Sequence, residues 1–247
     1  MELTIIYDYS VKGLVSGINN NSDKNEEAKM IQGTSKIVTT SYRSNTEISK
    51  KEEIHDNYLK NRASADIERA YKSLSISDGC KFFNNKEINL SGLRKLAMFT
   101  NSAQFHCSGN CVLLAACFHY NIKNGGYFLS AKNISNPFAG LDSICVDTLI
   151  FGKSLNESYS LSSFQELKNY IVNCYLNTGN ISFIIHAEGT ILGGIMDTAH
   201  DFNAVIVNTD GNIRVVFVDS WKTVHKVKSE KQMENSIHRN TYFYVRY

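Results

Sequence analysis

Three residues that lie far apart in the chain have the types and the order of a thiol catalytic triad: Cys111, His200 and Asp219. A free cysteine is mostly protonated at neutral pH, because its ordinary pKa is about 8.5. A neighbouring histidine can take up the thiol proton, and a carboxylate can hold the imidazole in one tautomer and stabilise its charge. The residue types therefore predict nucleophilic attack by Cys111 on a carbonyl or carboxamide carbon.

The residues after Cys111 predict the element that positions this thiol. Val112 to Tyr120 is apolar nearly all round, as in a buried central helix, and Asn121 to Gly126 ends the pattern. The first turn of a helix has backbone amides without intrahelical acceptors and the positive end of the helix dipole. Both features favour a thiolate, so we expect Cys111 in the first turn of this helix.

A hairpin is predicted to bring the other two residues together. Asp210-Gly211 is a two-residue turn signal between the strand candidates at 200–207 and 213–218. With these two residues at the centre of the turn, position 202 faces 219 and position 200 faces 221. His200 and Asp219 are then diagonal neighbours on one face, about 7 Å apart at the backbone. A slip of one residue would send Asp219 to the opposite face.

The attack also needs hydrogen-bond donors for the negative charge that develops on oxygen. The backbone amide of Cys111 is one candidate donor. Gln104, seven residues earlier, is the candidate side chain, and Asn110 is the alternative.

Other residues compete for these roles. Cys107 is a rival nucleophile, and with His106 and Cys111 it could be imagined as a metal site, but the spacing matches zinc sites poorly. We therefore expect neither a metal nor a cofactor. His186 is a rival base at the end of the strand candidate 181–185, where we expect no carboxylate on a following strand.

The chain divides by composition into two parts. Residues 1–75 are predicted to be a polar, partly mobile N-terminal extension with a helix near 57–74, because 16–60 is dominated by Asn, Ser, Thr, Lys and Glu. Residues 76–247 are predicted to form an α+β catalytic domain. Its further expected elements are helices at 93–99 and from the capping box Ser163-Phe164-Gln165-Glu166 to about 177, and a closing strand at 240–247.

The bulk composition limits the partners. The 26 basic and 24 acidic residues leave a net charge of +2, which does not indicate a dedicated nucleic-acid or anionic-membrane binder. No stretch approaches the roughly 18 apolar residues of a membrane span, and the first residues do not resemble a cleavable signal peptide. The six cysteines show no disulfide rhythm, so we expect reduced thiols and a protein or small-molecule partner.

Residues 100–247 resemble the papain-like cysteine enzymes, in particular the bacterial papain-fold toxins and effectors. Gly109-Asn110-Cys111 with its Ala-rich helix looks like their nucleophile segment, and the hairpin from His200 to Asp219 looks like their His/Asp hairpin. Gln104 is similar in place to the oxyanion glutamine of papain, one residue further away. Asp219-Ser220-Trp221 resembles papain's Asn-Ser-Trp, whose tryptophan shields the histidine hydrogen bond from water. The deamidase effectors tend to carry glutamine where this chain has Trp221.

The resemblance implies a papain-like fold in which the cysteine helix packs on an antiparallel sheet that carries the histidine and the aspartate. It implies deamidation of a glutamine side chain of a host protein through a thioester intermediate. A cysteine protease, for example one acting on ubiquitin-like chains, and a catalytically inactive binding module are the alternatives. The resemblance further implies release without a cleavable signal peptide, action in the host cytoplasm, and an N-terminal region able to bind a secretion chaperone.

Overall fold

The computed structural model describes residues 46–81, 88–101, 110–134, 140–191, 196–209, 211–221, 226–237 and 241–247. The chain forms two compact units. The described part of the first is 46–72 together with Asp142–Ser154, and the second comprises Ser73–Leu141 and Leu155–Tyr247. The chain therefore leaves the first unit at Lys72 and returns to it for Asp142–Ser154. No described helix is long and apolar enough to cross a membrane.

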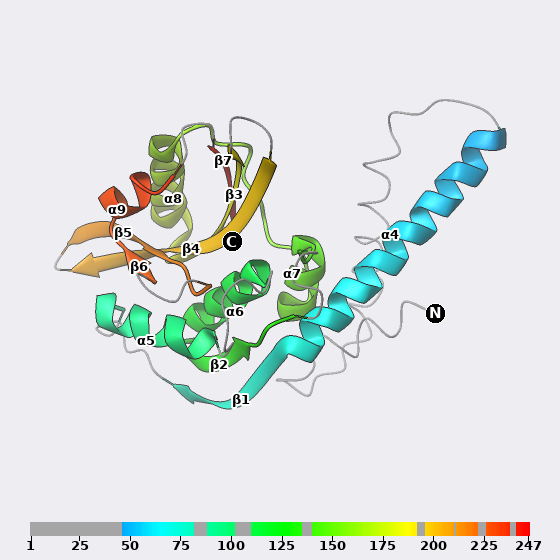
Figure 1. The fold of residues 1–247 in the computed structure, drawn as a ribbon. Helices are drawn as coiled ribbons and strands as arrows, with labels where there is room; N and C mark the ends of the chain where they lie inside the picture. The colour runs from blue at the N-terminus through cyan, green and yellow to red at the C-terminus, as the bar shows by residue number, and fades with distance from the viewer. Residues whose placement is uncertain are drawn as a thin grey trace. The chain divides into compact units, whose positions relative to one another are not determined.

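The described part of the first unit contains the helices α4 (Thr46–Ser73) and α7 (Ser143–Phe151). α4 covers the predicted helix at 57–74 and begins earlier (Figure 1). The buried carboxylate of Asp66 accepts hydrogen bonds from Arg69, at 2.5 Å, and from the backbone N–H of Asp142, at 3.1 Å. Asp142 in turn caps the N-terminus of α7 by accepting from the Cys145 amide. These bonds connect the two helices.

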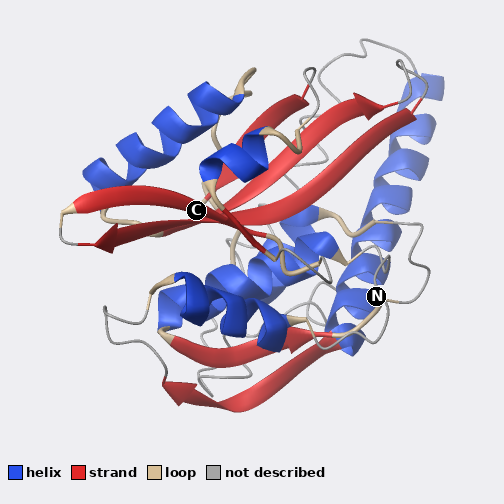
Figure 2. Cartoon of the chain, turned by 60° about the vertical axis from the view of Figure 1, so that its left-hand side comes forward, coloured by secondary structure: helices blue, strands red, loops and turns tan. Residues whose placement is uncertain are grey.

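The second unit has a five-stranded antiparallel sheet at its centre, in the order β6-β5-β4-β3-β7 (Figures 1 and 2). The long strand β4 is the middle strand. The strands are β3 (Ser182–Ile191), β4 (Met196–Thr209), β5 (Asn212–Val218), β6 (Val227–Lys228) and β7 (Thr241–Arg246), and a separate pair is β1 (Leu74–Lys81) with β2 (Gly126–Ala131). The helices are α5 (Leu90–Thr100), α6 (Cys111–Asn124), α8 (Phe164–Thr178) and α9 (Glu230–Glu234).

Helices cover both faces of this sheet, and an apolar cluster of described residues lies on each face. On one face Phe202, Ala204 and Ile206 of β4 pack with α8 and α9. On the other face Val205 and Val207 pack with α5 and α6. Because successive strand residues point to opposite faces, a strand buried on both sides is apolar at nearly every position. The architecture confirms the predicted α+β class, with helices packed on an antiparallel sheet.

The register of the β4–β5 hairpin is the predicted one. Asn203 pairs with Val218, and Thr209 pairs with Asn212, which leaves a two-residue connection. Gly211 in this connection has φ 85°, a conformation that glycine adopts without strain. The predicted closing strand is also confirmed, because β7 pairs with β3.

The strand predicted at 181–185 is longer in the structure. β3 runs to Ile191 and pairs with β4 along its whole length, so His186 lies inside the strand and not at its end. Gly189 lies inside this extension and pairs with Thr198 of β4 and with Thr241 of β7. Glycine is a poor strand former, but ladder hydrogen bonds on both sides of β3 outweigh that weak preference.

Candidate active site

Cys111 is the first residue of α6, as the sequence predicts. The eight residues that follow it, Val112–His119, are buried, whereas Cys111 itself is partly exposed and is a free thiol. The helix ends at Gly125, which has φ 64° and caps the last turn in the left-handed conformation. The thiol is therefore fixed at the N-terminus of a buried helix but remains accessible.

His200 of β4 and Asp219, which directly follows β5, are hydrogen-bonded at 2.9 Å between Nε2 and Oδ2. The His200 side chain is 30% exposed and that of Asp219 is 6% exposed. An ionised carboxylate can only accept, so Nε2–H is the donor. The other ring nitrogen of His200, Nδ1, is therefore available to a second partner. The side chain of Cys111 is hydrogen-bonded to His200 as well, so His200 stands between the thiol and the carboxylate.

The partners of His200 make it a strong base. Burial by itself lowers the pKa of His200, but hydrogen bonds with Asp219 and Cys111, together with the charges of both groups, raise it to about 10. The ring is therefore protonated at neutral pH. An imidazolium next to Cys111 places a proton donor beside the candidate nucleophile.

Trp221 and a local turn hold Asp219 in place. The second carboxylate oxygen, Oδ1, accepts from the backbone N–H of Trp221 at 3.2 Å, and the Asp219 amide donates to the carbonyl of Lys226 at 2.7 Å. The ring centroids of Trp221 and His200 are 5.3 Å apart, with the planes tilted by 60°. The indole covers part of the imidazole, and lower local polarity strengthens the His200–Asp219 hydrogen bond.

Asn203 is a residue of this site that the sequence analysis did not single out. Its side chain is fully buried and donates to the carbonyl of Ala115 at 2.9 Å and to that of Phe183 at 3.4 Å. Ala115 lies about one turn after Cys111 on α6, and Asn203 lies three residues after His200 on β4. Asn203 thus connects the helix of the thiol to the strand of the histidine. The available signal was a single polar residue among the apolar residues from Phe202 to Val207.

The structure describes one of the two candidate oxyanion side chains. Asn110 is buried at the N-cap position of α6, and its Nδ2 donates to the carbonyl of Lys132 at 2.8 Å, so it holds the start of the helix against the segment after β2. Gln104 lies outside the described residues, as do His106 and Cys107. Among the described residues there is no group of three or more His, Cys, Asp or Glu side chains that could hold a metal ion.

The expectation that His186 has no carboxylate on a following strand was wrong. β3 and β4 place His186 opposite Asp201, and Nδ1 lies 2.5 Å from Oδ1. Arg246 of β7 donates to the other oxygen of Asp201, and the Nε2 of His186 contacts Glu188 at 3.1 Å. The error follows from the length of β3, since a strand that ended at 185 would not reach Asp201.

The contacts of the second histidine–aspartate pair, His186 with Asp201, indicate a structural role. Burial would raise the pKa of Asp201, but the hydrogen bond from His186 and the charge of Arg246 hold it below its ordinary value. Asp201 is therefore a carboxylate with a hydrogen-bond donor on each oxygen. Among the described side chains, the histidine that is hydrogen-bonded to Cys111 is His200.

Comparisons with known proteins give a consistent result. A family model described as the Salmonella plasmid virulence protein SpvD matches residues 36–247. Virulence protein vsdE of Salmonella typhimurium and virulence protein SpvD of Salmonella dublin are each 38% identical over 194 residues, which are 78% of this chain and 90% of the relative. Solved structures of two variants of the Salmonella effector SpvD superpose with TM-scores of 0.68 and 0.61, at 40% and 36% identity. They cover 75% of this chain and 91% and 90% of those chains.

Proposed function

This chain belongs to the SpvD family of bacterial virulence effectors, and we propose that it is a cysteine-dependent hydrolase that cleaves amide bonds of host proteins. The observation that carries the proposal is the position of His200, which is hydrogen-bonded both to Cys111 and to Asp219. A partly exposed thiol at a helix N-terminus, a histidine base and a buried carboxylate are the three parts that thiol acyl transfer requires. The resemblance to papain-like enzymes supports the same assignment.

The proposed reaction has two steps, formation of a thioester and its hydrolysis. The Cys111 thiolate attacks the carbonyl carbon, and the tetrahedral intermediate collapses as Nδ1–H of His200 protonates the leaving amine, which leaves a thioester. Nδ1 then accepts a proton from a water molecule whose oxygen attacks the thioester carbon. This second step releases the carboxylic acid and restores the Cys111 thiolate. Asp219 keeps its hydrogen bond to Nε2–H throughout and stabilises the imidazolium.

The developing oxyanion needs donors near the thiol. The backbone N–H of Cys111 lies in the first turn of α6 and has no intrahelical acceptor, so it is the proposed main-chain donor. Gln104 is the proposed side-chain donor on the strength of the resemblance to papain.

Peptide bonds and glutamine side chains would react through the same thioester. The contact between Trp221 and His200 favours peptide-bond cleavage, because a tryptophan in this place is the papain arrangement. Deamidation of a glutamine side chain of a host protein is the second candidate, supported by the resemblance of Gly109-Asn110-Cys111 to the deamidase effectors. In both cases the proposed place of action is the host cytoplasm.

Quantitative proteomics on host-cell lysate distinguishes these reactions. Lysate is treated with the wild-type protein, with Cys111→Ala, or with Cys174→Ala as a matched control, since Cys174 is another partly exposed free thiol. New peptide termini that require Cys111 but not Cys174 would establish a protease. Site-specific conversion of glutamine to glutamate with the same dependence would establish a deamidase.

A second measurement tests the triad without a substrate. Alkylation by iodoacetamide at about pH 6 should be much faster at Cys111 than at Cys174, because the thiolate is the reacting species. Equal rates at the two thiols would contradict the proposed activation by His200. A protein with equal rates and without effect on lysate would be a binding module on the same fold.

A further inference from the structure

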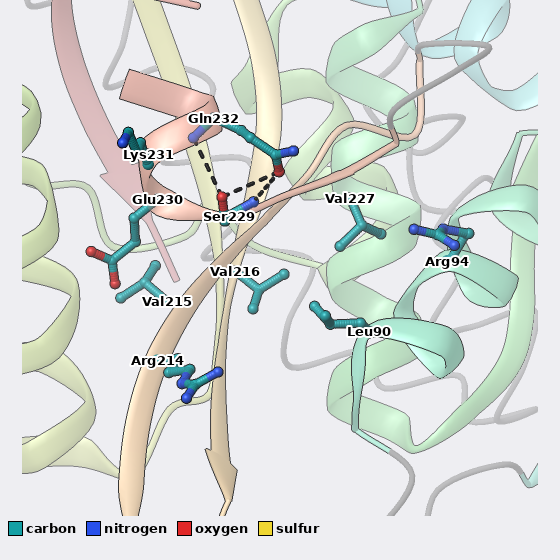
Figure 3. Close-up of a pocket in the computed structure, with 10 residues that line it drawn as sticks. All are labelled: Leu90, Arg94, Arg214, Val215, Val216, Val227, Ser229, Glu230, Lys231 and Gln232. Carbon is teal, nitrogen blue, oxygen red and sulfur yellow. Dashed lines mark hydrogen bonds between the residues drawn. The ribbon is translucent and has the colours of Figure 1, made fainter. Parts of the chain in front are cut away.

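A groove of about 680 Å³ lies on the second unit, and none of the residues that line it belongs to the triad (Figure 3). It follows the edge of β5 between α5 on one side and the start of α9 on the other. Its walls are Leu90 and Arg94 of α5, Arg214–Val216 of β5, Val227 of β6, and Ser229–Gln232.

The strand edge beside this groove is unpaired over part of its length. β6 pairs with β5 only at Phe217 and Val218. Within the described part of the chain, no strand pairs with the remaining residues of β5, Asn212–Val216, on that side. Of these residues, Asn212, Ile213 and Arg214 are exposed, so their backbone N–H and C=O groups can pair with a further strand, whereas Val215 and Val216 are buried.

The side chains around the open edge combine apolar surface with positive charge. Leu90 is 55% exposed beside the half-buried Val227, which gives the groove apolar contact surface. Arg94, Arg214 and Lys231 are exposed at its rim, and no carboxylate of the described residues forms an ion pair with any of them.

The acidic residue of the groove does not offset this charge. Glu230 forms an ion pair with Lys168 at 3.0 Å, and Lys168 does not line the groove. The three rim cations therefore set the sign of the field that a ligand meets.

We propose that this groove binds an extended acidic segment of a partner protein, which adds as a strand to the edge of β5. Main-chain hydrogen bonds to Asn212–Arg214 would give affinity, and alternate side chains of the segment would contact Leu90 and the rim cations. Charge complementarity selects an acidic partner and speeds its association. The proposal does not depend on hydrolysis by Cys111.

A selection from a library of random decapeptides tests it. Wild-type protein is compared with the double variant Arg94→Glu/Arg214→Glu and with Lys95→Glu, which reverses an exposed charge on α5 outside the groove. We expect acidic peptides with alternating apolar residues to be enriched on the wild type. Their binding should fall about tenfold or more in the double variant and change less than about twofold in Lys95→Glu. Cys111→Ala should bind them like the wild type.

The proposal would be overturned if the enriched peptides lacked acidic residues, or if they bound the double variant as well as the wild type. It would also be overturned if the double variant lost the binding of a single-stranded oligonucleotide but kept the binding of peptides. Because the exchanged side chains are exposed, the fold should persist, and Arg94→Gln/Arg214→Gln provides a neutral second variant. Hydrogen exchange then tests the strand addition itself. The enriched peptides should slow amide exchange in 212–214, and peptides with alternate N-methylated amides should not.

Discussion

Replacement of Asp219 by asparagine should lower the pKa of His200, so that the pH range over which Cys111 faces a protonated imidazole ends at a lower pH. Asparagine has nearly the same shape as aspartate and can still accept the Nε2–H hydrogen bond through its amide oxygen, but it removes the negative charge. The pKa of His200, now about 10, depends on that charge and on Cys111, which together outweigh the effect of burial. The substitution therefore isolates the electrostatic part of the pair.

The size of the effect follows from the geometry. Two unit charges at the observed 2.9 Å attract by about 6 kcal/mol at an effective dielectric constant of 20, which is an upper limit because the ring is 30% exposed. Hydrogen bonds to charged groups contribute about 1.5–3 kcal/mol in measured cases. At about 1.4 kcal/mol for each pKa unit, the pKa of His200 should fall by roughly one to two units.

The sign of the linked stability change follows from the same shift. The folded-state pKa of His200 lies above its ordinary value of 6.5, so the pair stabilises the fold fully below that pH. The contribution is lost as the pH rises from there through about 10. In Asp219→Asn this loss should be smaller and should be complete at a lower pH.

Titration of the His200 ring by NMR, with isotope-labelled histidine, measures the shift directly. The alkylation rate of Cys111 across the same pH range gives its chemical consequence. Glu188→Gln is the matched control, because it removes an exposed carboxylate that contacts the other paired histidine, His186. An unchanged His200 midpoint in Asp219→Asn, or an equal shift in Glu188→Gln, would refute the assigned role of Asp219.

Three further substitutions test the framework around the site. Asn203→Leu removes the donor to the Ala115 carbonyl, so the free energy of unfolding in urea should fall by about 1–3 kcal/mol and alkylation of Cys111 should slow; unchanged values would exclude a positioning role. Arg246→Met leaves the buried carboxylate of Asp201 without its arginine partner and should cost about 3 kcal/mol in the same assay, whereas an unchanged free energy of unfolding would mean that the ion pair contributes no net stability. Ser163→Ala removes the N-cap of α8 and should cost about 1 kcal/mol, observed as a lower urea midpoint with an unchanged slope.

Several features of the site could be predicted because local interactions specify them. The turn at Asp210-Gly211 and the two-residue period of the strands determine the hairpin register, and the register brings His200 and Asp219 together. The position of α6 follows from the apolar run that begins directly after Cys111 and from Gly125, which caps the last turn of the helix. The cap of α8 by Ser163 follows from the capping-box pattern. Each signal lies within a few residues of the structure it specifies.

Other features depend on contacts between distant segments, which the local pattern does not contain. The bond from Asn203 to the Ala115 carbonyl joins residues 88 positions apart, and it forms only because α6 packs against β4. The pairing of His186 with Asp201, and of Asp201 with Arg246, requires β3 between β4 and β7 and a β3 longer than its apolar core. The return of Asp142–Ser154 to the first unit has no signal in the sequence pattern. The sequence by itself determined the hairpin that carries His200 and Asp219 and the helix that begins at Cys111. Strand order and helix packing decided which buried polar groups hold these elements together, because a buried polar group takes its partner from whichever segment packs against it.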